Sequence, residues 1–107
     1  MTTTPWIRVA RQEEIPHGQI RVFEAGEESI AICRTTTGAL FAVEDVCTHD
    51  GGPLGEGVLD EYAIECPRHG ARFDMRTGAV VCMPAVVPVR TFPVREEAGE
   101  VFVQVEG

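Results

Sequence analysis

The chain has 107 residues, of which 44% are hydrophobic and 24% are charged. This length supports one hydrophobic core, and the formal net charge of -8 argues against nucleic acid, whose phosphates would repel the surface. The sequence shows neither a secretory leader nor an apolar run long enough to span a bilayer, so we expect one cytoplasmic domain, residues 1–107, with no membrane contact.

Short strands separated by turns are predicted for the first part of the chain. Apolar runs rich in Ile, Val and Phe occur at residues 19–24, 29–34 and 40–43, and the turn signals 25–27 and 35–38 separate them. These runs predict an antiparallel meander. Cys33 lies within the second run and is expected to fill the core, because a free cysteine behaves as a small hydrophobic residue.

The middle segment, from about 45 to 84, has a different composition. It is richer in Gly, Pro and Cys than the rest of the chain and is predicted to form a small inserted subdomain. Within it, residues 62–66 and 71–75 are strand-like, and a turn is expected at 75–78.

The C-terminal part predicts a second hairpin, with strands at 91–95 and 101–105 around a turn at 96–100. Val101, Val103 and Val105 alternate with polar residues, as a half-buried strand requires. The only helical signal is one turn at 11–15. The predicted fold class is therefore all-β, with antiparallel strands.

Two clusters in the middle segment carry metal-ligand chemistry. Cys47-Thr48-His49 reads C-x-H, and after sixteen intervening residues Cys66-Pro67-Arg68-His69 reads C-x-x-H. Thiolates stabilise ferric iron, whereas neutral imidazoles add no negative charge, so two of each favour a higher redox potential than four thiolates. Two such loops can hold a [2Fe-2S] cluster, with both cysteines on one iron and both histidines on the other.

The residues around these ligands resemble those of Rieske iron-sulfur proteins. The resemblance covers C-T-H-x-G-G from Cys47, C-P-x-H-G-x-x-F-D-x-x-T-G from Cys66, and nearly the whole chain. It implies the Rieske fold, an antiparallel β base domain with an inserted cluster-binding subdomain at about 45–84. It also implies one [2Fe-2S] cluster per chain, a third loop containing Pro84, and packing of Cys82 near that cluster.

The resemblance also indicates which kind of Rieske protein this is. Respiratory members carry a further cysteine in each loop, at the positions of Gly52 and Arg68 here, so their bracing disulfide cannot form in this chain. The stretch 70–73 also lacks the hydroxyls that respiratory members direct at the cluster, which predicts a potential near roughly -150 mV. The chain resembles instead the ferredoxins of bacterial ring-hydroxylating oxygenase systems. That resemblance implies a monomeric one-electron carrier between a flavoprotein ferredoxin reductase and a terminal oxygenase.

Other residues near the ligands have simpler expected roles. Four glycines, Gly51, Gly52, Gly55 and Gly70, follow the ligand pairs and are expected to provide positive φ angles in the loops. His17 is expected to be an exposed turn residue, and Asp50 and Asp74 to be solvated carboxylates.

Two other functions use the same four ligand residues. The first is a zinc-stabilised interaction module, since Cys2His2 sites have similar spacings. The second is a redox-sensing or cluster-assembly accessory protein. Catalysis by the chain itself is not expected, because the sequence shows no nucleophile with an adjacent base, no phosphate-binding loop and no second metal constellation.

Overall fold

The described part of the chain consists of short antiparallel β-strands and one turn of 3-10 helix, without an α-helix. The computed structural model describes residues 5–68, 70–83, 85 and 87–105. His69 and Pro84 therefore lie outside the described residues. The predicted all-β fold class is confirmed.

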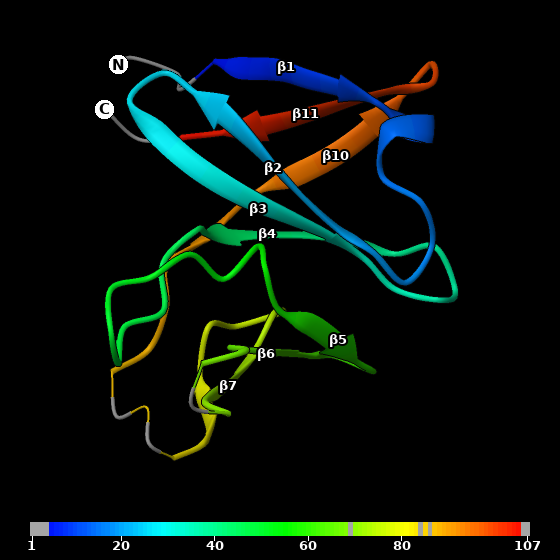
Figure 1. Ribbon diagram of the computed structural model, residues 1–107. Coiled ribbons are helices and arrows are strands. Elements are labelled where there is room, and N and C mark those ends of the chain that lie inside the picture. The colour runs from blue at the N-terminus through cyan, green and yellow to red at the C-terminus, as the bar shows by residue number, and fades with distance from the viewer. Residues whose placement is uncertain (1–4, 69, 84, 86, 106–107) are drawn as a thin grey trace.

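The strands form three sheets, which lie in layers (Figure 1). The first sheet has the order β1-β11-β10 and the second has the order β2-β3-β4-β9; together we call them the base. The third sheet has the order β5-β6-β7-β8, and with the preceding segment 45–57 we call it the small lobe. The base elements are β1 Trp6–Arg11, η1 Gln12–Glu14, β2 Ile20–Ala25, β3 Glu28–Arg34, β4 Leu40–Glu44, β9 Thr91–Phe92, β10 Val94–Glu97 and β11 Glu100–Gln104. The lobe strands are β5 Val58–Asp60, β6 Ala63–Glu65, β7 Arg72–Asp74 and β8 Val80–Cys82.

Strand β3 is buried on both faces, because it lies between two hydrophobic cores. Successive side chains of a strand point to opposite faces. Ile30 and Ile32 pack in the core between the two base sheets, whereas Ala31 and Cys33 pack in the core shared with the small lobe. The second base sheet therefore packs against the lobe with one face. The expected core position of Cys33 is confirmed.

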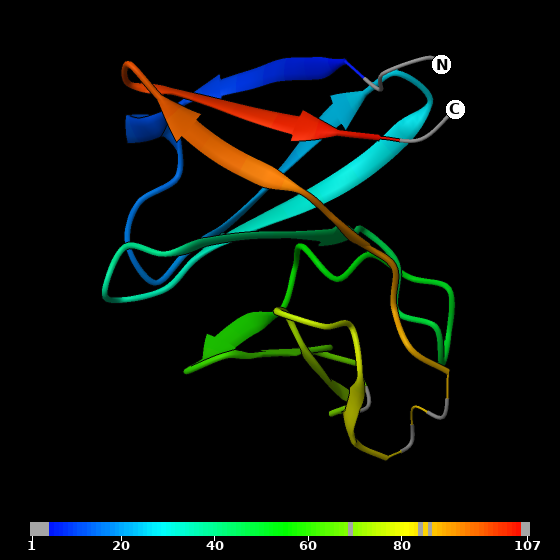
Figure 2. The same cartoon turned by 180° about the vertical axis from the view of Figure 1, so that it is seen from behind.

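The chain changes sheets at Pro93. Phe92 in β9 pairs with Ala42 of β4, but Val94 in β10 pairs with Val103 of β11. Proline has no N–H to donate to a strand ladder, so it suits the position between two sheets. The prediction of one strand over 91–95 was therefore wrong at this residue. Figure 2 shows the chain rising from the lobe and entering the orange strand β10 of the base.

Three strands were not predicted from the sequence, namely β1, β5 and β8. In β1 the register shifts between Arg8 and Ala10, so its apolar residues do not alternate regularly. The other two contain only three residues each, which is too few for a periodic signal. Both lie at the edges of the lobe sheet.

Candidate metal centre

Two loops of the small lobe share one backbone hydrogen-bond pattern. In the first, the Cys47 N–H donates to the carbonyl five positions later (2.7 Å), and the Gly51 N–H donates to the Cys47 carbonyl (2.7 Å). In the second, the Cys66 N–H donates to the carbonyl five positions later (2.8 Å), and the Gly70 N–H donates to the Cys66 carbonyl (3.1 Å). Each cysteine therefore begins a tight loop of the same design.

Only two of the four loop glycines have the expected backbone conformation. Gly51 and Gly70 have φ angles of 77° and 75°, which confirms the prediction for them. Gly52 and Gly55 do not have positive φ, so the prediction was wrong there. Both glycines leave room for a neighbouring side chain: a Cβ at Gly52 would lie 2.6 Å from Cζ of Arg68, which would have to move, and one at Gly55 would overlap the Val22 side chain.

The two loops bring Cys47 and Cys66 together. Both side chains are buried in the core that the lobe shares with the base, beside residues such as Phe73. Their sulfur atoms and a carboxylate oxygen of Asp50 all lie within 4.8 Å of one another. Burial raises the pKa of the Cys47 thiol, which favours its protonated form. Because a metal binds cysteine as the thiolate, metal binding there must displace this proton.

The predicted histidine ligands can be placed only in part. His49 is exposed, two residues after Cys47 in the first loop. His69 lies outside the described residues, so its position remains a prediction. His17 belongs to the turn before β2, where it is exposed and its Nδ1 lies 3.2 Å from the Thr36 carbonyl oxygen, as expected for a turn residue.

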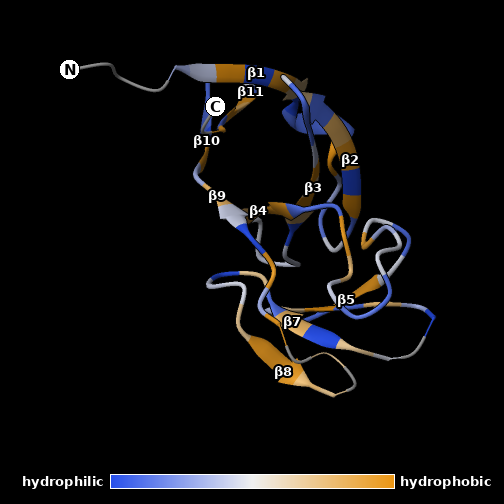
Figure 3. Ribbon diagram, turned by 90° about the vertical axis from the view of Figure 1, so that its left-hand side faces the viewer, coloured by the Kyte–Doolittle hydropathy of each residue, from blue (hydrophilic) through white to orange (hydrophobic). Residues whose placement is uncertain are grey.

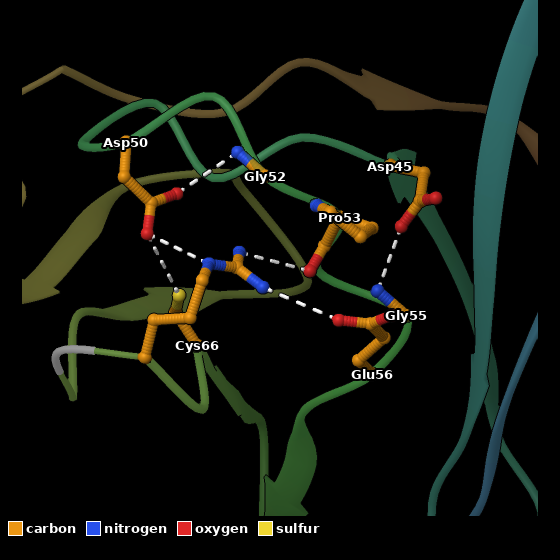
Figure 4. Close-up of polar contacts among 8 residues, drawn as sticks. Asp45, Asp50, Gly52, Pro53, Gly55, Glu56 and Cys66 are labelled. Atoms are coloured by element: carbon orange, nitrogen blue, oxygen red, sulfur yellow. Dashed lines mark hydrogen bonds and ion pairs between the residues drawn. The ribbon is translucent and has the colours of Figure 1, made fainter.

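An ion pair between Asp50 and Arg68 was missed by the sequence analysis. The Arg68 Nε donates to Asp50 Oδ2 at 2.7 Å, and the Gly52 N–H donates to Asp50 Oδ1 at 2.9 Å (Figure 4). These two donors hold the pKa of the Asp50 carboxyl well below its usual range, with Arg68 contributing most. Asp50 is exposed in its loop, as expected, but its carboxylate is also paired with Arg68. The one available signal was an arginine directly before a predicted ligand.

Asp74 is likewise a partly exposed carboxylate that is paired with an arginine. It lies at the end of β7, where the Arg76 Nη2 donates to its Oδ2 at 2.8 Å. This bond lowers the pKa of Asp74. The pair lies within one turn of the chain and links no separate loops.

The loops provide few hydroxyl groups to the two sulfur atoms. Ala71 occupies a buried position after Gly70, and the Thr48 hydroxyl donates to the Val87 carbonyl at 2.5 Å. The Thr48 proton is therefore already used on the backbone. Hydrogen bonds to the sulfurs raise the potential of such a centre, so the low potential expected from the sequence stays a prediction.

The two remaining cysteines differ in burial. Burial raises the pKa of the Cys33 thiol to about 12. Cys82 is exposed in β8, opposite Arg72 of β7. The expected packing of the Cys82 side chain is not found, because β8 is an edge strand of the lobe sheet and Cys82 is exposed there; its nearness to the cluster stays a prediction.

The donor set fits a [2Fe-2S] group. Two buried thiols from separate loops lie close enough to share one iron, and a histidine follows each of them in the sequence. A profile of the Rieske [2Fe-2S] domain matches residues 5–93. The chain belongs to the Rieske [2Fe-2S] domain family. The cofactor of this Rieske protein is accordingly a [2Fe-2S] cluster.

Known Rieske proteins resemble the chain over nearly its full length. It is 38% identical over 100 residues to the ferredoxin component of biphenyl 2,3-dioxygenase from Rhodococcus jostii RHA1, covering 94% of this chain and 92% of that protein. The ferredoxin of carbazole 1,9a-dioxygenase from Nocardioides aromaticivorans IC177 has a TM-score of 0.90 at 30% identity, covering 96% of this chain and 100% of that one.

A third relative is the ferredoxin in a complex of reduced oxygenase and oxidised ferredoxin of carbazole 1,9a-dioxygenase. Its TM-score is 0.85 at 35% identity, and the match covers 95% of this chain and 94% of that one. In the part of the chain that the structure describes, no helix has the length and apolarity needed to cross a membrane.

Proposed function

We propose that this Rieske protein carries single electrons from a flavoprotein ferredoxin reductase to a terminal oxygenase. The main support is the buried Cys47–Cys66 pair in a chain whose relatives are dioxygenase ferredoxin components over more than nine tenths of its length. We further propose that it acts as a cytoplasmic monomer and catalyses no reaction itself.

We assign four ligands to the cluster. Cys47 and Cys66 would hold one iron, and His49 and His69 would hold the other. When bound, the cluster supplies a centre that accepts and releases one electron. The chain contributes the enclosure of the thiol side, since both cysteines are buried, and the exposure of the His49 side, where a partner protein can approach.

Exposed apolar side chains in β8 and the segment that follows it support docking of a partner. Val81, Met83 and Val87 have exposed fractions of 56%, 76% and 53%. The hydrogen bond from Thr48 to the Val87 carbonyl joins this segment to the loop that carries His49. Figure 3 shows the hydrophobic strand β8 at the end of the lobe remote from the base. Exposed apolar patches of this kind mark interaction sites, and we assign this one to the oxygenase.

Reconstitution with purified partners tests the proposed function. The reductase, this protein and the oxygenase should together hydroxylate an aromatic substrate at the expense of reduced nicotinamide, and omission of this protein should stop the reaction. Reduction by the flavoprotein in the absence of the oxygenase should bleach its visible absorbance. Failure of every reductase of this class to reduce the holoprotein would overturn the proposal.

A matched pair of variants tests the docking surface. Met83→Glu introduces a charge directly after β8, whereas Val58→Glu introduces it in β5, at the opposite edge of the lobe sheet. We expect Met83→Glu to raise the concentration of ferredoxin needed for half-maximal oxygenase turnover about tenfold or more, as loss of a central contact does. Val58→Glu should have little effect. Equal effects of the two variants would place the docking surface elsewhere.

We also propose that residues 1–107 act as one domain, within which the lobe at about 45–84 is inserted. The core that surrounds Cys47 and Cys66 contains Ala31 and Val43 of the base as well as residues of the lobe. A domain is expected to have its own core. The shared core supports treating lobe and base as one folding unit.

A further inference from the structure

Arg68 connects the second ligand loop to the first through three separate groups. Its Nε donates to Asp50 Oδ2 at 2.7 Å, its Nη2 donates to the Pro53 carbonyl at 3.0 Å, and its Nη1 lies 3.4 Å from Glu56 Oε1. All three acceptors belong to the segment that follows Cys47 (Figure 4). A guanidinium group is planar and presents several donors in fixed directions, so it can hold such a set of acceptors in one geometry.

The first loop is shaped to receive this side chain. A Cβ at Gly52 would lie 2.6 Å from Cζ and 2.7 Å from Nε of Arg68, closer than real contacts permit. Positions 52 and 68 therefore face each other across the two loops, and glycine at 52 leaves room for the guanidinium. The Gly52 N–H in turn donates to Asp50, which fixes the carboxylate that Arg68 contacts.

The two charged residues stand directly beside the proposed histidine ligands. Asp50 follows His49 in the sequence, and Arg68 precedes His69. The ion pair therefore links the backbone next to one histidine with the backbone next to the other. The Arg68 side chain is 29% exposed and that of Asp50 is 16% exposed, so solvent screens this pair less than a fully exposed one.

The ion pair also sets the charge near the sulfur atoms. A carboxylate oxygen of Asp50 lies within 4.8 Å of both cysteine sulfurs, and Asp50 Oδ2 is 3.9 Å from the Cys66 sulfur. An unpaired negative charge there would oppose the arrival of an electron. Arg68 neutralises this charge through a short contact with the same oxygen atom, Asp50 Oδ2.

We propose that Arg68 is a positioning residue that holds the two ligand loops together around the cluster and offsets the negative charge of Asp50. The three contacts of its side chain then do in this protein what the disulfide between the same two loop positions does in the respiratory members that the chain resembles. The inference rests on the ligand assignment made under the proposed function.

Release of the cluster tests the bracing role. The holoproteins of Arg68→Gln and Asp50→Asn, incubated with an iron chelator, should lose their visible absorbance about tenfold faster than the wild type, the lower end of the effect expected when a residue that orients metal ligands is replaced. The double variant should be no worse than either single one. Arg72→Gln is the matched control, because Arg72 pairs with Glu65 and Asp60 on the lobe sheet and does not join the ligand loops.

The midpoint potential tests the electrostatic role, because replacing a purely structural residue would not shift this potential. Arg68→Gln should lower the potential, Asp50→Asn should raise it, and the double variant should lie between them. Arg68→Lys keeps the charge but loses the planar set of donors, so it should retain a potential close to that of the wild type while releasing the cluster faster.

A double-cysteine variant separates the two roles. Oxidised Gly52→Cys/Arg68→Cys should form a disulfide and release its cluster as slowly as the wild type, yet its potential should fall because the cation is gone. Unchanged release and potential in Arg68→Gln and Asp50→Asn would overturn the inference. If His49→Ala still holds the cluster, the ligand assignment itself is wrong, and that result is independent of the Arg68 variants.

Discussion

The sulfur atoms of Cys47 and Cys66 lie within 4.8 Å of each other, although the two residues belong to separate loops of the small lobe. Matching hydrogen bonds from Gly51 and Gly70 close the two loops in the same way. The two loops therefore bring both thiols close enough to bind one iron. The proposed histidines follow these thiols by two and three positions in the sequence.

Replacement of His49 tests the ligand assignment. His49→Ala should yield protein with little or no cluster absorbance, because one iron would lose one of its two proposed histidine ligands. His17→Ala is the control, since that histidine lies in an exposed turn of the base, and its absorbance spectrum should match the wild type. A colourless His17→Ala protein would show that the ligands have been assigned wrongly.

Metal analysis distinguishes a Rieske cluster from zinc. Protein purified without oxygen from iron-supplied cells should contain about two iron atoms and about two acid-labile sulfides per chain. Electron paramagnetic resonance of the dithionite-reduced protein should give the low average g value typical of histidine-ligated iron. A colourless protein with one zinc per chain and no sulfide would contradict the cluster and favour the interaction module.

The midpoint potential should lie near roughly -150 mV, the lower end of the Rieske range. The physical reason is the shortage of hydroxyl donors: Ala71 has none, and the Thr48 hydroxyl already donates to the Val87 carbonyl. Protein-film voltammetry at neutral pH measures this value directly. A midpoint above zero would mean that other donors reach the cluster.

Two buried isoleucines should separate global stability from cluster retention. Ile30→Ala in the base core and Ile64→Ala in the core shared with the lobe should each lower the free energy of unfolding by about 2–5 kcal/mol. Chelator-induced release should accelerate mainly in Ile64→Ala, because only Ile64 packs in the core that contains Cys47 and Cys66. Equal acceleration in both variants would show that the two cores do not open separately.

The reactivity of the thiols should differ sharply between Cys82 and Cys33. Burial raises the pKa of Cys33 from 9.0 to about 12, so at pH 9 only roughly one Cys33 in a thousand is ionised, and its thiolate grows only as the pH approaches 12. Cys82 is exposed. An aromatic disulfide reagent should therefore titrate one fast thiol per native holoprotein, and Cys82→Ser should remove it. A fast thiol that persists in Cys82→Ser would contradict the burial of Cys33.

Much of the base could be predicted because its strands are apolar runs bounded by turns. The runs that became β2, β3 and β4 were placed within a few residues by their Ile, Val and Phe content and the turns between them, and β11 by its regular alternation. The break at Pro93 was missed, because the apolar pattern continues through it while the partner strands change. The side-chain period records which residues are buried but not which sheet buries them.

The meeting of Cys47 and Cys66 could be predicted from their spacing, whereas the Asp50–Arg68 pair could not. Ligand motifs are local, so residue types and short intervals identify them. The ion pair depends on how two loops face each other, and on the space left at Gly52, neither of which is visible in a linear pattern. The same holds for Cys82, whose exposure follows from the edge position of β8.

The burial of both faces of β3 has a consequence for protein engineering. Ala31 and Cys33 line the core that encloses the thiol pair, so a peptide cut from the lobe alone would leave that core open to water on one side. Transplanting the redox centre into another scaffold would accordingly require a host strand with small side chains at the two equivalent positions. Bulky residues there would push the grafted loops away from their support.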